Sequence, residues 1–413
     1  MSGTDVAHPL IAPVPRLARP GRALARRRVL GALARAWQGS GAGRLEVRLP
    51  DGARVRLGAA GAPDATITVA DERAFVRVAL RGELGAGEAF VAGEWTAADL
   101  RGALRLFRRA TAARGLESWL TRLAVTAARR RHRRAANDRA GSARNVGAHY
   151  DLGNAFYRLF LDDQLIYSCA LWPPGARDLE AAQVVKLDRL CDLAAIGPGA
   201  RVLELGCGWG ALAIHAARRG ARVTAVTVSP AQLAEARARV AAAGVADRVD
   251  VALCDYRDTT GRYDAILSCE MLEAVGAEFL PGFFATVAAR LQPGGRAAIQ
   301  SITMPDARYA AYRRSVDWMQ TYVFPGTHIP SLGAIDAALA GTGLTRVAAD
   351  DIGPDYAPTL RAWRERFTAA LPAVRRLGFD EPFVRTWTLY LAFSEAAFAE
   401  RTLTNHQLVL RRT

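Results

Sequence analysis

From about residue 200 onward, apolar runs of strand length alternate with helical stretches. The runs are RVLELG, ARVTAVTVS, VDVALCD, YDAILSCEML and GRAAIQSIT, and helical stretches such as PAQLAEARARVAAAG (230–244) separate them. This alternation predicts an α/β fold, with a doubly wound sheet of parallel strands and helices on both faces. Ligands of such folds bind beyond the carboxyl ends of the strands, so functional residues are expected in the loops that follow them.

The first of these loops, LELGCGWG, is rich in glycine. The strand is expected to end at Leu205, and three glycines then allow a tight turn into a helix and a close approach of ligand to backbone N–H groups: Gly206, Gly208 and Gly210. The loop lacks GK[ST], which excludes a phosphate-cradling P-loop. Cys207 is interpreted as a small residue that fits the loop, and Trp209 as an exposed wall of the ligand pocket.

Residues after the neighbouring strands favour one nucleotide cofactor. The second strand ends in TVSPAQ (227–232), without the acid that would hold an NAD ribose. Glu204 lies just before the glycine loop, and Asp255 followed by Tyr256 ends the third strand. Glu204 and the Asp255–Tyr256 pair could together hold a positively charged molecule that contains a ribose and an adenine ring. S-adenosylmethionine therefore fits these positions better than NAD.

Composition bounds the class of protein. With 413 residues, 51% of them hydrophobic, the chain is expected to form two globular domains. The five cysteines have neither paired nor zinc-ligand spacing, which is typical of a reducing compartment and predicts no metal site. No apolar run approaches the ~20 residues that cross a bilayer, and the N-terminus has no signal-peptide core. The sequence therefore predicts a soluble, cytoplasmic protein.

The net charge of +15 is concentrated at the front. Residues 1–145 contain 27 Arg against 12 Asp and Glu, whereas residues 146–413 contain 28 basic and 28 acidic side chains. A basic front half predicts an anionic partner, either nucleic acid or the surface of an anionic membrane.

Three segments are expected ahead of the α/β domain. Residues 1–38, rich in proline and arginine, are predicted to be a basic mobile arm. Residues 39–126 are predicted to form a small α+β domain that docks on membranes: the hairpin LEVRLPDGARVRLG, a strand and helix in ATITVADERAFVRVAL, turn glycines in GELGAGEAFVAGEW, then an amphipathic helix. Residues 127–146 are a basic linker, either solvated or in contact with an anion. The catalytic domain is expected at 147–413.

Several motifs together resemble the cyclopropane-fatty-acyl-phospholipid synthase family, which includes the mycolic acid cyclopropane synthases. They occur in the family's order: HYDLGNAFYRLFLDDQLIYSCALWPPG (149–175), VLELGCGWG (202–210), VTVSPAQ (226–232), MLEAVG (271–276), YVFPG (322–326) and LYLAFSEAAF (389–398). The resemblance implies a class I methyltransferase with a Rossmann-like fold. Such an enzyme moves the methyl group of S-adenosylmethionine onto a double bond in unsaturated acyl chains of membrane phospholipids. It would associate peripherally with the inner face of the membrane.

The resemblance also implies site residues. The cofactor site would be lined by Tyr167, Ser168, Gly206, Gly208, Thr227, Gln232, Asp255 and Tyr256, with Glu204, Cys207, Trp209, Gly210 and Ser229 beside them. His149 either contacts the cofactor or begins a helix. The family holds a bicarbonate ion as general base, and the positions that match its holders are Cys169, Glu273, the backbone of Ile302, Tyr390 and, in fifth place, Gln300.

Taken alone, Cys169 is a nucleophile, a metal ligand, a packed core thiol or an anion ligand. The resemblance favours a thiol that donates to bicarbonate, with an inert buried thiol as the alternative; a core tyrosine is likewise the alternative for Tyr390. The chemistry agrees, because methylating an alkene leaves a carbocation that must be kept from water and must lose a proton to a base already in place.

Two positions depart from the cyclopropane synthases, which have histidine where this chain has Ala274 and Gln300. Glutamine donates a hydrogen bond but carries no proton. This version resembles the branch that makes methyl- or methylene-branched acyl chains, and the choice between branch and ring stays open. A saturated branch would need a separate reductase, and a homodimer is open because full-length members can be dimers.

Three other classes compete. A nucleic-acid methyltransferase is disfavoured by the neutral back half and by the missing Asn/Asp-Pro-Pro-Tyr motif, so no nucleic acid is expected as partner. A small-molecule O- or N-methyltransferase would leave the front domain without a task. A non-catalytic lipid-binding protein would not need an intact glycine loop.

Overall fold

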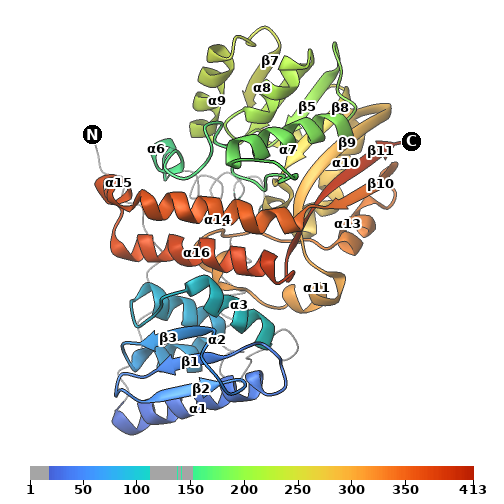
Figure 1. Ribbon diagram of the computed structural model, residues 1–413. Coiled ribbons are helices and arrows are strands. Elements are labelled where there is room, and N and C mark those ends of the chain that lie inside the picture. Colours follow the sequence, from blue (N-terminus) through green and yellow to red (C-terminus); the bar gives the residue numbers. More distant parts are fainter. Residues whose placement is uncertain (1–17, 112–136, 138–140, 142–151) are drawn as a thin grey trace. The chain divides into compact units, whose positions relative to one another are not determined.

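The computed structural model of the protein describes residues 18–111, 137, 141 and 152–413 (Figure 1). These residues form two compact units. The first unit comprises the segments Met1–Arg134, Arg313–Pro325 and Thr368–Thr402. The second unit comprises Ala135–Tyr312, Gly326–Phe367 and Leu403–Thr413. The expected catalytic domain at 147–413 therefore differs from the second unit, which lacks two of its segments. The linker expected at 127–146 lies outside the described residues except for Asn137 and Gly141.

The second unit contains a seven-stranded sheet in the order β10-β11-β9-β8-β5-β6-β7. The five predicted runs form parallel strands: β5 (Arg201–Leu205), β6 (Arg222–Thr227), β7 (Val249–Leu253), β8 (Tyr263–Cys269) and β9 (Leu291–Thr303). Two further strands were not predicted, β10 (Leu344–Asp351) and β11 (Thr404–Arg412). Because β11 is antiparallel to both of its neighbours, β9 and β10, the sheet is mixed. The α/β fold is confirmed, but a wholly parallel sheet is wrong.

Helices cover both faces of this sheet (Figure 1). On one face lie α7 (Leu179–Leu193), α8 (Ala211–Arg218) and α9 (Pro230–Ala242), and on the other lie α10 (Leu280–Arg290) and α13 (Leu332–Leu339). Two separate apolar cores result, as expected for a doubly wound sheet. Further helical segments are α6 (Asn154–Tyr157), η1 (Tyr256–Asp258), η2 (Leu272–Ala274), η3 (Ala277–Phe279), α11 (Asp306–Tyr312) and α14 (Gly353–Ala369).

The first unit contains a four-stranded sheet in the order β2-β1-β3-β4. The strands β1 (Leu45–Arg48) and β2 (Arg54–Leu57) form the predicted hairpin. As predicted, β3 (Ala65–Val69) leads into a helix, α2 (Arg73–Val91). After β4 (Trp95–Ala97) comes α3 (Leu100–Thr111), the predicted amphipathic helix. The small α+β domain is therefore present.

Two predictions for this unit are wrong. Within the predicted mobile arm, α1 (Arg19–Trp37) is a helix that buries Val29 and Leu33; residues 1–17 lie outside the described part. Of the glycines expected in turns, Gly82, Gly85 and Gly87 lie within α2, which is kinked at Gly82 (φ +57°), and only Gly93 (φ +74°) lies in a turn. A Cβ on Gly87 would lie 2.3 Å from the Trp318 ring, so glycine there allows close packing.

Segments from late in the chain complete the first unit. They are α12 (Trp318–Tyr322), α15 (Leu371–Arg376) and α16 (Glu381–Ala399). Arg105 Nε lies 2.6 Å from Glu400 Oε1, and Arg109 Nε lies 2.7 Å from Glu400 Oε2. These ion pairs join α3 to the end of α16, which explains why residues 368–402 belong to this unit.

Candidate functional site

A cavity of about 180 Å³ lies where β5, β6, β7 and β8 end. Most of the predicted cofactor residues line it: Tyr167, Ser168, Glu204, Gly206, Cys207, Gly208, Trp209, Thr227, Gln232, Asp255 and Tyr256. Gly210 and Ser229 do not line it, and His149 lies outside the described residues. The structure therefore brings together residues from four separate loops, as expected at the carboxyl edge of a parallel sheet.

The glycine loop depends on the absence of side chains. Gly206 has φ +79°, and a Cβ there would lie 2.6 Å from Met271 Cγ. Gly208 has φ +52° and lines the cavity with bare backbone. Gly210 caps α8 in the left-handed conformation, and a Cβ on it would lie 3.3 Å from Ala236 Cβ. The first two glycines shape the cavity, and the third starts the helix.

Glu204 supplies a buried acid to the cavity wall. Its side chain is 2% exposed, and its Oε2 has no hydrogen-bond partner among the residues that the structure describes. Burial raises the pKa of this carboxyl to about 8. A buried carboxyl oxygen without a partner is costly, so a cationic donor bound in the cavity would stabilise it.

The polar residues in the turn between β6 and α9 either cap the helix or line the cavity. Ser229 caps α9, because its hydroxyl accepts from the backbone N–H of Gln232 at 3.3 Å. The hydroxyl of Thr227 donates to Gln232 Oε1 at 2.8 Å, and both side chains line the cavity. Ser229 therefore shapes the turn without reaching the cavity.

At the end of β7, Asp255 is paired within the protein. Arg257 donates to its carboxylate at 2.8 and 2.6 Å, and Tyr256 packs edge-on against Phe283 with 5.3 Å between ring centroids. Asp255 and Tyr256 both line the cavity, so the predicted acid–aromatic pair is present, with its charge balanced by Arg257.

The opposite wall is aromatic. Tyr157 contacts the ring of Tyr167 at 5.5 Å and that of Trp209 at 5.1 Å between centroids. Trp209 is only 3% exposed, and its indole N–H donates to Asn154 at 2.8 Å. The prediction that Trp209 is a pocket wall agrees with its position, but the prediction that it is exposed is wrong, because this wall is packed from behind.

Lys186 was missed by the sequence reasoning. It is the one lysine among 55 basic residues, it is 1% exposed, and it lines the cavity. Its ammonium group donates to Ser168 Oγ at 2.7 Å and lies 3.6 Å from Cys269 Sγ. The signal was in the composition, because a single lysine in an arginine-rich chain marks a position that calls for a compact ammonium group.

Several predicted anion-binding residues lie beside this cavity. Cys169 is fully buried, its backbone N–H donates to Glu270 Oε1 at 2.9 Å, and its thiol lies 3.2 Å from the Ala170 carbonyl oxygen. Burial, followed by the charge of Glu270, raises the pKa of this thiol well above its ordinary value. The thiol is therefore protonated and not a thiolate nucleophile.

Gln300 is fully buried on β9. Its side-chain amide donates to the Cys169 carbonyl at 3.1 Å and to Glu270 Oε1 at 2.9 Å, and its Oε1 accepts from Gln407 at 3.0 Å. Both amide hydrogens are thus used within the protein.

Glu273 lies in η2 and is 8% exposed. Its Oε1 accepts from the Ser301 hydroxyl at 3.0 Å and from the backbone N–H of Ile302, and no described residue gives its Oε2 a hydrogen bond. Burial, and then the charge of Glu270, raises the pKa of this carboxyl to about 8. Glu273 is therefore protonated at neutral pH, and the Ile302 N–H is already used.

Glu270 was also missed. It follows β8, lines the cavity and has a left-handed backbone (φ +50°). Four donors hold its carboxylate: Oε1 accepts from Cys169 N–H, Gln300 and Asn405 at 2.9, 2.9 and 2.6 Å, and Oε2 accepts from the Tyr356 hydroxyl at 2.6 Å. The sequence held one indication of this role, because Glu270 is a charged residue within the mainly apolar stretch SCEMLEA.

Tyr390 lies in the first compact unit. It is 5% exposed, and its ring contacts Trp387 and Phe324 at 5.2 and 5.4 Å between centroids. It thus packs as a core tyrosine on α16, which was the alternative expectation, and its contact with an anion stays a prediction.

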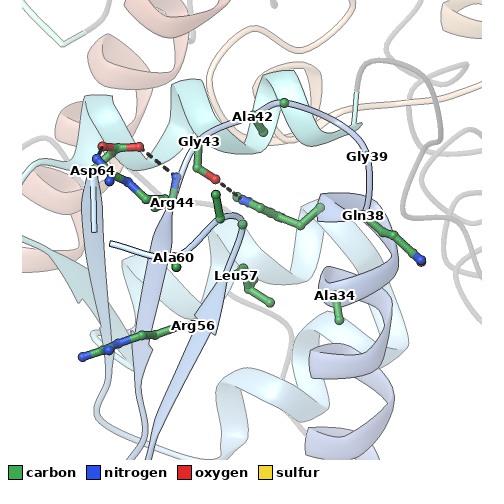
Figure 2. A pocket seen from close by; sticks show the side chains of 14 residues that line it. Ala34, Gln38, Gly39, Ala42, Gly43, Arg44, Arg56, Leu57, Ala60 and Asp64 are labelled. Atoms are coloured by element: carbon green, nitrogen blue, oxygen red, sulfur yellow. Dashed lines mark hydrogen bonds and ion pairs between the residues drawn. The ribbon is translucent and has the colours of Figure 1, made fainter. Parts of the chain in front are cut away.

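A larger hollow of about 690 Å³ lies in the first unit, between the end of α1, the segment that leads into β1, and the end of β2 with the loop after it (Figure 2). Trp37 donates to the Gly43 carbonyl at 3.0 Å, and Arg44 pairs with Asp64 at 2.7 Å. Arg56 pairs with Glu46 at 3.3 Å. Because its charged side chains are paired with acids of the same unit, this hollow offers less chemistry than the cavity of the second unit.

Comparisons with known proteins agree with this geometry. Residues 137–408 match the family model described as mycolic acid cyclopropane synthetase. The chain is 44% identical to tuberculostearic acid methyltransferase UfaA1 of Mycobacterium tuberculosis over 347 residues, which cover 81% of this chain and 80% of that protein. It is 34% identical to cyclopropane-fatty-acyl-phospholipid synthase of Escherichia coli K12 over 356 residues, covering 85% and 89%. The solved structure of mycolic acid cyclopropane synthase CmaA1 complexed with SAH and CTAB has a TM-score of 0.60 and 26% identity, covering 65% of this chain and 98% of that one.

Proposed function

We propose that this protein methylates the double bond of unsaturated acyl chains in membrane phospholipids. The chain belongs to the mycolic acid cyclopropane synthetase family and is a lipid-modifying C-methyltransferase that depends on S-adenosylmethionine. The proposed product is a methyl- or methylene-branched chain. Two observations support the branch: the relative named a methyltransferase is 44% identical and the one named a cyclopropane synthase 34%, and Gln300 and Ala274 stand where the cyclopropane synthases have histidine.

One observation carries the cofactor assignment: one cavity is lined both by a glycine-rich loop and by a buried acid, Glu204, whose Oε2 has no hydrogen-bond partner among the described residues. S-adenosylmethionine carries an ammonium group, a carboxylate and a sulfonium, and it supplies an electrophilic methyl group when bound. Glu204 would accept from the ammonium group, and Lys186 would attract the carboxylate. The residues present therefore fit this cofactor.

The remaining chemistry falls to the walls of the site. Methyl transfer to an alkene leaves a carbocation on the acyl chain, which water would capture. The aromatic residues Tyr167 and Trp209 line the cavity, with the buried Tyr157 packed against both, and these rings exclude water and favour a nearby cation.

The family resemblance implies a bicarbonate ion as proton acceptor, but three of its five expected holders, Cys169, Gln300 and Ile302, do not fit this task because they already use their donors within the protein. The amide hydrogens of Gln300 and the backbone N–H of Ile302 are used by protein acceptors. The Cys169 thiol lies against a carbonyl oxygen, and its backbone N–H donates to Glu270. The proposed reaction therefore does not use bicarbonate as its base.

The proposal includes peripheral binding to the inner, anionic face of a membrane. On α1, one face exposes Leu24, Arg27, Arg28 and Arg35, and none of these arginines has an ion pair within the described residues. Basic residues near an anionic surface each contribute about 1 kcal/mol. In the part of the chain that the structure describes, no helix is both long and apolar enough to span a bilayer.

Two partners complete the proposal. A saturated methyl branch requires a separate reductase, because methyl transfer followed by proton loss leaves an alkene. Association into a homodimer follows from the family resemblance alone, and sedimentation of the purified protein tests it.

The proposed function is tested by product analysis. The protein is expressed in a host that lacks a cyclopropane synthase, methyl-labelled methionine is supplied, and the membrane acyl chains are examined by NMR, because ring and methylene products have equal mass. Labelled methylene- or methyl-branched chains are expected. Labelled rings would overturn the branching assignment, and unlabelled acyl chains would overturn the function.

A further inference from the structure

A side chain of the protein already uses donors that an external base would need. Two of the five residues expected to hold bicarbonate donate to the carboxylate of Glu270, Cys169 through its backbone N–H and Gln300 through its side-chain amide. Asn405 and Tyr356, which come from β11 and α14, add two more donors. A carboxylate has the shape and charge of a bicarbonate ion, so these donors are matched to the side chain that they hold.

Its hydrogen bonds leave Glu270 able to accept a proton from the cavity side. Three N–H groups donate to Oε1, which requires that oxygen to be an acceptor. Among the residues that the structure describes, Oε2 accepts only from Tyr356 and so has a lone pair left for a proton. Unlike the buried Glu273, Glu270 is partly exposed and lines the cavity assigned to the cofactor.

The backbone at this position is unusual for a side chain. Glu270 adopts φ +50°, a conformation that costs a residue with a Cβ about 1–2 kcal/mol and that glycine adopts freely. Strain at one residue of a ligand cavity suggests that its side chain has a task there.

The neighbouring acid is suited to a different role. Glu273 uses Oε1 as an acceptor, and burial raises its pKa to about 8, so it is protonated at neutral pH. Two nearby carboxyl groups in different protonation states commonly divide the roles of acid and base. Glu270 is the member of this pair whose two oxygens accept four hydrogen bonds.

We propose that Glu270 is the proton acceptor of this enzyme and that it replaces the bicarbonate ion, so that turnover needs no added bicarbonate. This inference rests on the proposed function. The alkene electrons form the new carbon–carbon bond, and the carbon–sulfur bond breaks with its electrons left on sulfur. A C–H bond beside the cation then supplies the electrons of the new double bond, and its proton goes to Glu270 Oε2 and afterwards to solvent. A proton beside a carbocation is so acidic that a well-held carboxylate is basic enough to remove it.

The first test uses the unaltered full chain. Transfer of label from methyl-labelled S-adenosylmethionine to vesicles of unsaturated phospholipid is measured in buffer freed of carbon dioxide, and again after bicarbonate is added. We expect the same turnover in both. A rise of about tenfold or more on adding bicarbonate, which corresponds to about 1.4 kcal/mol in the barrier, would overturn the inference. Label that reaches lipid only with bicarbonate refutes this inference alone, whereas no label under either condition refutes the proposed function.

The second test removes the acceptor. Glu270→Gln keeps the shape of the side chain but removes its charge, and turnover should fall by about 100-fold or more while affinity for S-adenosylhomocysteine changes little. Glu278→Gln is the matched control, because Glu278 is exposed and has no hydrogen bond within the described residues; its turnover should equal that of the unaltered chain. Glu270→Gln with full turnover would refute the assignment.

The third test restores a base from solution. Glu270→Gly suits the left-handed backbone and leaves the donors of Cys169, Gln300, Asn405 and Tyr356 facing a space the size of a small carboxylate. Turnover of this variant should be low, and formate or bicarbonate should raise it by about tenfold or more. Full turnover of Glu270→Gly without any added anion would contradict the inference. Binding of S-adenosylhomocysteine verifies that each variant is folded.

Discussion

The cofactor assignment can be tested by measuring the protons that Glu204 releases when the cofactor binds. Its buried Oε2 has no partner, and burial raises its pKa from 4.5 to about 8. If the ammonium group of S-adenosylmethionine binds there, the carboxyl must ionise as the cofactor enters. Binding at neutral pH should therefore release a proton, and affinity should increase with pH by up to about tenfold per unit until pH reaches about 8, where it levels off.

Replacing Glu204 by glutamine removes this titration. A charge-assisted hydrogen bond contributes about 1.5–3 kcal/mol, so Glu204→Gln should weaken cofactor binding by about 10- to 100-fold. The stability of the unliganded protein should change with pH in the opposite direction to the cofactor affinity. An acid with a raised pKa loses stability as pH rises from its unfolded value of 4.5 to about 8, so Glu204→Gln should lack that loss and should melt above the unaltered protein at alkaline pH.

Calorimetric titration in two buffers with different ionisation enthalpies measures both the affinity and the proton release. Thermal melts without cofactor, recorded from acid to alkaline pH, measure the stability term. Affinity that does not change with pH, together with unchanged binding by Glu204→Gln, would refute the assignment of this carboxyl to the ammonium group.

Three further predictions concern the cofactor loop, the lone lysine and the membrane face. Lys186→Met removes the ammonium group that donates to Ser168 at 2.7 Å and should weaken cofactor binding by about tenfold; because the chain has no other lysine, mass spectrometry after amine acylation should show this residue protected by cofactor. Gly206→Ala would place a Cβ 2.6 Å from Met271 Cγ at φ +79° and should abolish cofactor binding, whereas Gly282→Ala, in open space on α10, should leave it intact. Reversing the charge of both Arg27 and Arg28 should weaken sedimentation of the full chain with anionic vesicles, and the binding that remains should depend less on salt; equal binding at every salt concentration would exclude this face of α1.

The predictable part of the fold is the part with short-range signals. The five parallel strands are covered on both faces and therefore appear as apolar runs in the sequence. By contrast, β11 carries polar residues, such as Asn405 and Gln407, that are buried only because other segments supply their hydrogen bonds. Likewise α1 has a short apolar stripe among arginines, and it is a helix because the first unit covers that stripe.

The candidate site divides in the same way. Glycine spacing and the acid before it predicted the loop around Gly206 and the position of Glu204. The role of Glu270 depends on partners that are between 30 and 135 positions away along the chain, which no local pattern brings together. Ile302 and Gln300 were matched by position to an anion site, but their donors serve acceptors in the protein, and only the folded arrangement reveals this.

The most direct test of the central claim compares two lipids that differ by one double bond. The purified full chain is incubated with methyl-labelled S-adenosylmethionine and vesicles of either unsaturated or saturated phospholipid, and the label in head groups and acyl chains is counted separately. The proposed function predicts label in the acyl chains of the unsaturated lipid alone. Label in the head groups, equal labelling of the saturated lipid, or label that reaches added RNA in place of lipid would contradict it.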